Sequence, residues 1–342
     1  MKRLLRLLPG LLVSLAFTLW FVLRAHWGEV ADALKGVDAP LVALSATVLF
    51  SEFFIRTLRF KVLVRPLAPN ARFWRLFVAT LIGMSLNVVL PLRAGDIARP
   101  FLSARETGTP VLPLVTIAVI ERVFDILGLI SILLIMVMIL PADAQAHGEL
   151  VTNLKIYGSI FGVAGIGSMI VFLALAAREQ AARHIFARIV SIAPKPVGDR
   201  FLFLFDGFVK GLESVRSRRA LVEAGALSLL HWLNGSISIY VLFQAFSIDL
   251  PFAAACFMTV AIALTVALPQ APGFFGVFHV AIETTLVLWG LDPAPAQAFA
   301  IVFWAVSFVP VATAGAIAWW REGLTLVTLR DQAARLEPAP GK

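Results

Sequence analysis

The sequence predicts an all-α polytopic membrane protein, and three observations carry that prediction. Hydrophobic residues make up 60% of the 342 positions, charged residues 15%, and the mean hydropathy is +0.90. Soluble proteins are typically about half apolar and about a quarter charged. Long apolar runs recur along the chain, and the basic residues gather between them. We therefore expect about six full transmembrane helices plus two re-entrant helical hairpins in a single membrane domain, residues 1–342.

The apolar runs set the order of the expected elements, since about 20 residues span a hydrocarbon core of about 30 Å. Lys2, Arg3 and Arg6 precede the first run as in a signal peptide, but no small-x-small cleavage site follows, so we expect a retained helix. The runs cover residues 7–24, 40–55, 73–91, 111–140, 156–177, 220–246, 252–268, 274–290 and 297–320.

Charge between the runs predicts the orientation by the positive-inside rule. Residues 56–75 contain six Lys or Arg and no acid, and the segment 178–219 is also strongly basic, so both are expected in the cytoplasm. The acidic segments 25–39 and 141–155 are expected outside. This parity places both termini, including a short tail at 321–342, on the cytoplasmic side of a bacterial inner membrane.

The same parity requires two re-entrant hairpins. The run at 73 and the run ending at 140 must both begin inside, so the chain has to turn back between them, at Pro91 and Gly95. An uncharged second turn contains Pro269, Pro272, Gly273 and Gly276. We expect two inverted repeats, about 40–140 and about 220–320, each with a hairpin as in secondary transporters.

Polar residues surround the first turn. Asn87, Arg93, Asp96 and Arg99 flank it, and an arginine fork suits a phosphate because it donates two hydrogen bonds to one oxyanion. The structural alternative is that Asp96 pairs with Arg93 or Arg99, three residues away on either side, and neutralises the turn.

Further ionisable residues lie inside apolar runs. Glu121, Arg122 and Asp125 can point to one side of a helix and form either a sealed ion pair or a proton-coupled or arginine-pairing group. His279 and Glu283, at a spacing of four, could form a proton relay, answer the first-half charges, or belong to the core. We interpret His231 and Asn234 as structural, and Arg200–Arg219 as a helix in the membrane interface.

Several classes of function are disfavoured. The single cysteine, Cys256, precludes a disulfide within the chain and a thiolate metal site, and no P-loop, nucleophile elbow or HExxH motif is present. We therefore expect no catalytic residue, no metal and no cofactor, and a protein that is not an enzyme. The net charge of +8 does not indicate nucleic acid, because the basic residues cluster between apolar runs. The expected partners are membrane lipids, with a homo-oligomer or a lipid-modifying enzyme as a further partner.

These motifs resemble the transmembrane, flippase-like region of lysylphosphatidylglycerol synthase, over nearly the whole chain. The most specific part is N-x-x-x-P-x-R-x-G-[ED]-x-x-R followed by E-R-x-x-D, with weaker support from Arg56-x-x-Arg59-Phe60 and P-x-x-P-G-x-x-G at 269–276. The resemblance implies translocation of a lipid, namely an aminoacyl-phosphatidylglycerol, a hopanoid or a polyprenyl-linked lipid, without its modification. The pattern departs at Asp96 and His279, where glutamate is expected, and at Phe274, where glycine is expected.

We interpret Arg93, Arg99 and Arg122 as residues that engage the headgroup, and Asp96, Glu121 and Asp125 as residues that balance or release it. Asn87, His279 and Glu283 are further candidates for substrate binding. Two alternatives stay open from the residues. One is a membrane-embedded enzyme acting on a lipid phosphate, with an acidic residue or His279 as base. The other is a proton-coupled transporter of a small water-soluble solute.

Overall fold

The computed structural model describes residues 8–90, 93–139, 195–267 and 272–323, together with 177–190 and a few positions between 163 and 175. All described elements are helices, and four are long and apolar enough to cross a membrane. The predicted all-α polytopic membrane protein is confirmed. The four long helices are α4 (Ala39–Val64), α7 (Val111–Ile139), α11 (Arg218–Ala245) and α14 (Pro293–Arg321).

Shorter helices complete the bundle. Of the six predicted full spans, four coincide with the long helices, the first falls on α2, and the run 156–177 lies largely outside the described residues. The shorter elements are α2 (Leu8–Arg24), α3 (Trp27–Lys35), α5 (Phe73–Val89), α6 (Ala94–Thr107), α9 (Glu179–Val190), α10 (Lys195–Gly211), α12 (Phe252–Ala267) and α13 (Val277–Leu288), with 3₁₀ turns η3 (Leu212–Val215) and η4 (Pro272–Phe274).

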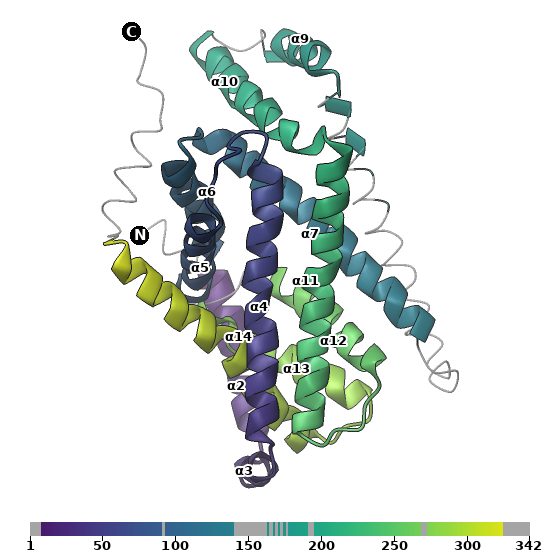
Figure 1. Ribbon diagram of the computed structural model, residues 1–342. Coiled ribbons are helices and arrows are strands. Elements are labelled where there is room, and N and C mark those ends of the chain that lie inside the picture. The colour runs from purple at the N-terminus through teal and green to yellow at the C-terminus, as the bar shows by residue number, and fades with distance from the viewer. Residues whose placement is uncertain are drawn as a thin grey trace.

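Helices α4 and α11 run antiparallel, side by side, at the centre of the bundle (Figure 1). The start of α4 meets the end of α11, where the Asp38 amide donates to the Ala245 carbonyl at 2.9 Å. Further along the same pair of helices, the Ser45 hydroxyl donates to the Ser238 carbonyl at 2.8 Å, and both serines are fully buried. Small polar side chains of this kind let two helices approach closely within a membrane.

The two predicted hairpins lie between pairs of long helices. Helices α5 and α6 pack against each other between α4 and α7, and η4 with α12 and α13 occupies the same place between α11 and α14. The order long, short, short, long thus occurs twice, and the two leading helices are antiparallel. This order favours the interpretation of 40–140 and 220–320 as inverted repeats, which stays a prediction.

The basic segment forms helices at one end of the bundle. Figure 1 shows α9 and α10 beyond the C-terminal end of α4, and α3 at the opposite end. Gly207 and Gly211 of α10 lie directly against Leu112 and Thr116 of α7, so a larger side chain at either glycine would not fit.

One part of the predicted charge map is wrong. Residues 56–75 are expected in a cytoplasmic segment, but α4 continues through Arg56 and Arg59 to Val64. Arg59 is 1% exposed. An arginine can stay inside a membrane bundle where carboxylates of a neighbouring helix pair with it, and the positive-inside rule counts only the charge, not the partners.

Candidate functional site

The first hairpin is closed by side-chain contacts between its two arms. The Asn87 amide donates to Asp96 Oδ1 at 2.9 Å, and the Asp96 backbone amide donates to Asn87 Oδ1 at 3.2 Å. Arg93, the residue before α6, has left-handed backbone angles (φ 52°, ψ 44°). These bonds fix the tip of the hairpin and leave the Arg93 and Asp96 side chains more than one-third exposed, at 38% and 37%.

Gly95 has a different role from the one the sequence suggests. The sequence places the turn at Pro91 and Gly95, but Gly95 lies inside α6, and the residue with left-handed backbone angles is Arg93. A Cβ on Gly95 would collide with the Gly83 carbonyl of α5. The missing side chain therefore allows the two arms to touch. Pro91, the other predicted helix-breaking residue here, lies outside the described residues.

Behind this hairpin, buried charges join three helices. Arg59 of α4 contacts Asp125 of α7 at 2.6 Å and Glu121 of α7 at 3.5 Å, and Arg99 of α6 forms an ion pair with the other oxygen of Glu121. Glu121 is fully buried, and the Arg59 and Arg99 side chains are 2% and 7% exposed. Arg59, Arg99, Glu121 and Asp125 therefore form a buried ion network that joins α4, α6 and α7.

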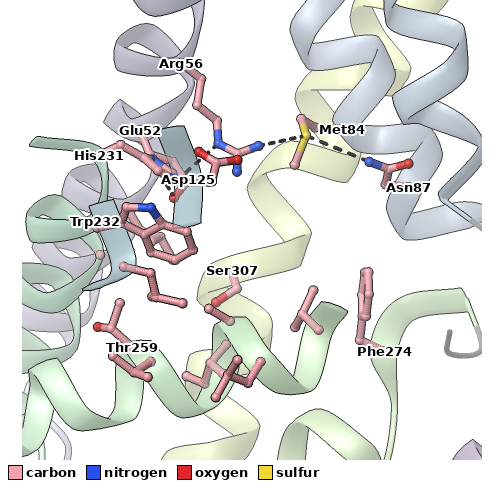
Figure 2. Close-up of a pocket in the computed structure, with 18 of the residues that line it drawn as sticks. Glu52, Arg56, Met84, Asn87, Asp125, His231, Trp232, Thr259, Phe274 and Ser307 are labelled. Carbon is pink, nitrogen blue, oxygen red and sulfur yellow. Dashed lines mark hydrogen bonds and ion pairs between the residues drawn. The ribbon is translucent and has the colours of Figure 1, made fainter. Parts of the chain in front are cut away.

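In front of the network lies a cavity of about 550 Å³, shown in part in Figure 2. Its lining is divided by chemistry. Helices α4, α5, α6, α7 and α11 contribute the polar side: Glu52, Arg56, Asn87, Arg93, Asp96, Arg122, Asp125 and His231. Most of the rest of the lining is apolar and includes Phe274, Phe278, Phe303 and Phe308 from η4, α13 and α14.

Most of the predicted site residues meet at this cavity. Asn87, Arg93, Asp96, Arg122 and Asp125 all line it, with Arg122 3.3 Å from Asp125 and its side chain 40% exposed. By contrast, Arg99 and Glu121 lie behind the wall, in the ion network.

The second pair of predicted residues is elsewhere. His279 and Glu283 do not line this cavity. Glu283 accepts a hydrogen bond from Gln297 of α14 at 2.9 Å, and the His279 ring packs among aromatic rings that include Phe21 and Trp304. Neither contact joins them to the charges of the first half.

The second turn keeps the predicted breaks where they are described. Gly273 and Gly276 have left-handed φ angles of 75° and 78°, and Phe274 between them has φ 57°. The Trp304 indole donates to the Gly273 carbonyl at 2.7 Å and holds this turn against α14. Phe274 thus occupies a conformation that glycine adopts more easily. Pro272 starts η4, and Pro269 lies outside the described residues.

Three ionisable residues of the cavity are absent from the site predicted from sequence, namely Glu52, Arg56 and His231. Glu52 and Arg56 of α4 point towards His231 of α11, as Figure 2 shows. The Arg56 Nε donates to His231 Nε2 at 3.4 Å, and its Nη1 lies 3.3 Å from the Met84 sulfur. The available signal is a pair of charges at a spacing of four beside an apolar run. In sequence, however, Arg56 opens the basic segment 56–75, and a lone histidine such as His231 indicates a structural role.

Within the described ranges, no three His, Cys, Asp or Glu side chains gather as metal ligands would. The cavity lining combines charged and apolar side chains, a combination that suits an organic ligand with both characters.

Three relatives are similar to this chain over most of its length. Over 96% of this chain, 23% of residues are identical to the glycosyltransferase AglD of Haloferax volcanii, and the match spans 56% of that protein's length. A UPF0104 membrane protein of Methanothermobacter thermautotrophicus is 24% identical over 93% of the chain and 92% of its own length. A UPF0104 membrane protein of Methanocaldococcus jannaschii is 26% identical over 69% of the chain and 94% of its own length. No solved structure matches the chain.

These comparisons correct one expectation and confirm another. The prediction that the protein is not an enzyme is contradicted, because a relative matched over nearly the whole chain is named a glycosyltransferase. The family resemblance is confirmed by a match over residues 7–315. The chain is thus a multi-pass membrane protein that belongs to the family described as the lysylphosphatidylglycerol synthase TM region.

Proposed function

We propose that this protein binds a membrane lipid in the cavity and moves it between the two leaflets. The headgroup would lie among the charged side chains, with Arg93 and Arg122 contacting a phosphate, while Asp96 and Asp125 balance their charge. The acyl chains would follow the apolar lining of α12, α13 and α14.

The division of the cavity into a charged side and an apolar side carries this proposal. Its volume of about 550 Å³ is within the usual range for ligand sites, about 300–1,000 Å³. A small water-soluble solute could use the charged side, but it would leave the phenylalanine-rich lining without a partner. A lipid uses both sides, so the solute-transporter alternative is disfavoured.

The orientation of the protein is part of the same proposal. Arg65 at the end of α4 pairs with Glu223 of α11 at 3.0 Å, and Arg75 of α5 pairs with Glu322 at the end of α14 at 3.2 Å. The end of the bundle where α4 and α14 finish and α5 and α11 begin thus contains Arg65, Arg75, Arg218 and Arg321. By the positive-inside rule this end would face the cytoplasm of a bacterial inner membrane.

A second candidate function rests on the name of one relative. Because AglD is a glycosyltransferase, the cavity could instead hold a lipid that accepts or donates a sugar, with a cavity carboxylate near the reacting group. This chain spans 56% of that relative, so the shared part need not contain its transferase activity. Product formation by the purified protein decides between the two functions.

The test is reconstitution of the purified protein in vesicles with fluorescent phospholipids, followed by quenching from outside. The native protein should speed exchange between leaflets. Arg122→Gln should slow it by removing a phosphate contact, and Ala263→Trp should slow it by filling the apolar side of the cavity. Arg105→Gln, on the exposed face of α6, is the matched control and should exchange lipid normally.

The same vesicles, given a nucleotide sugar or a lipid-linked sugar, are then analysed for lipid products by mass spectrometry. A glycosylated product that requires the cavity residues would support the second candidate. Exchange that survives both Arg122→Gln and Ala263→Trp would refute a path through this cavity.

A further inference from the structure

Glu52 and Arg56 occupy adjacent turns of α4 and both line the cavity, yet they do not pair with each other. A glutamate and an arginine at a spacing of four usually attract one another on a helix. Within the described part of the chain, no carboxylate oxygen lies within 4.0 Å of the Arg56 guanidinium. Its two hydrogen-bond partners are an imidazole nitrogen and a thioether sulfur, and the latter is a weak acceptor.

Glu52 also lacks a strong hydrogen-bond or ion-pair partner among the described residues. Among the described residues, the ionisable group within 4.0 Å of its carboxylate is His231, whose Nδ1 lies 3.9 Å from Glu52 Oε2; this is too long for a hydrogen bond, and the Glu52 side chain is 18% exposed. His231 thus sits between the two and bonds to Arg56 alone. Glu52 and Arg56 are partly buried, and charged groups withdrawn from water without strong partners are costly, which makes these two candidates for contact with a ligand.

The local charge balance adds to this. Among the described residues, five arginines in the cavity lining and the network behind it face four carboxylates. Arg59 and Arg99 are bound to carboxylates in the network, so the surplus positive charge lies at the cavity, where Arg56 has no carboxylate. An oxyanion is the ligand group that such a position binds best.

We propose that Glu52 and Arg56 bind the headgroup at two points. Arg56, together with Arg122, binds the phosphate, and Glu52 accepts hydrogen bonds from a donor group elsewhere in the headgroup. The ligand is then a phospholipid whose headgroup carries an ammonium or hydroxyl group as well as a phosphate. This inference rests on the proposed function, because it names the lipid class that the same cavity selects.

The experiment is native mass spectrometry of the purified full chain with four lipids of identical acyl chains. Phosphatidylethanolamine offers an ammonium donor, phosphatidylglycerol offers hydroxyl donors, phosphatidylcholine offers a phosphate without donors, and diacylglycerol offers no phosphate. The native protein should hold the two donor-bearing phospholipids about tenfold more tightly than phosphatidylcholine, as one charge-assisted hydrogen bond implies. The stronger of the two identifies the donor as ammonium or hydroxyl.

The two residues should have separable effects. Glu52→Gln should reduce the preference over phosphatidylcholine and leave phosphatidylcholine binding unchanged. Arg56→Gln should weaken all three phospholipids and leave diacylglycerol unchanged. Glu52→Leu provides a second neutral variant without a polar group to bury, and Glu106→Gln, at a residue of α6 that pairs with Arg75 and does not line the cavity, is the control. Unfolding temperatures of all variants show that each is folded.

Two results overturn the inference: a native protein that binds phosphatidylcholine as tightly as the donor-bearing lipids, or a preference that both Glu52 variants retain. Leaflet exchange by the native protein separates this failure from a failure of the proposed function. If exchange persists and is blocked by Ala263→Trp, only the proposed binding of the headgroup by Glu52 and Arg56 is wrong. If no lipid binds and none is exchanged, the proposed function fails with it.

Discussion

Glu121 is the residue whose loss should most destabilise the bundle. Its carboxylate is fully buried, one oxygen is paired with Arg99, and the other lies 3.5 Å from Arg59. Glu121→Gln keeps the shape but removes the negative charge. Arg59 would still have Asp125 at 2.6 Å, whereas Arg99 would lose its paired carboxylate and keep the neutral amide oxygen of the glutamine and the face of the Phe60 ring, 4.6 Å from its guanidinium carbon.

The expected cost is that of one uncompensated buried charge, about 3–5 kcal/mol. A comparison comes from Glu106, which lies 3.6 Å from Arg75 near the end of the bundle, where the Arg75 side chain is 51% exposed. Glu106→Gln should cost below about 1 kcal/mol, because an exposed pair contributes little.

The assay is unfolding of the purified protein in mixed micelles by increasing fractions of SDS, followed by tryptophan fluorescence. Adding Arg99→Met to Glu121→Gln removes the orphaned charge and should recover most of the lost stability. The reasoning is refuted if Glu121→Gln falls within about 1 kcal/mol of Glu106→Gln, or if the second substitution gives no recovery.

Three further substitutions test packing by the same unfolding assay. Gly95→Ala should cost about 1–3 kcal/mol by forcing the arms of the first hairpin apart. Gly225→Ala, where a Cβ meets nothing closer than 4.0 Å, is the control and should be neutral or slightly stabilising. Equal effects would contradict the close approach of α5 and α6 at Gly95. Trp304→Phe removes the bond to the second turn and should cost about 0.5–1.5 kcal/mol, so an unchanged midpoint would show that the bond is dispensable. Ser45→Ala should cost about 0.6 kcal/mol, and a loss above about 2 kcal/mol would indicate a larger rearrangement between α4 and α11.

Much of the fold could be predicted because it depends on local pattern. Apolar length marks the long helices, and Pro-Gly signals at 91–95 and 269–276 mark the two hairpins. The side of α7 that carries Glu121 and Asp125 also follows from helical spacing alone. These features need no knowledge of which helix lies next to which.

The polar side of the cavity could not be predicted without knowing which helices are neighbours. Arg59 and Asp125 are separated by 66 positions, and Arg56 and His231 by 175, so no window of sequence contains both partners. Without the partners, two arginines after an apolar run indicate the end of a helix. With them, the same residues lie inside α4 and form part of the site. Gly95 shows the same limit, because its close contact with Gly83 is made across the hairpin.

The ion network also distributes stiffness unevenly around the cavity. Sliding α6 or α7 past α4 would separate buried opposite charges, which is expensive in a medium of low dielectric constant. The α12 part of the wall contacts its neighbours mainly through apolar side chains, and such contacts can be exchanged for similar ones at small cost. The charged wall is therefore the rigid side of the cavity. A change in the width of the cavity costs least free energy when the α12 wall moves.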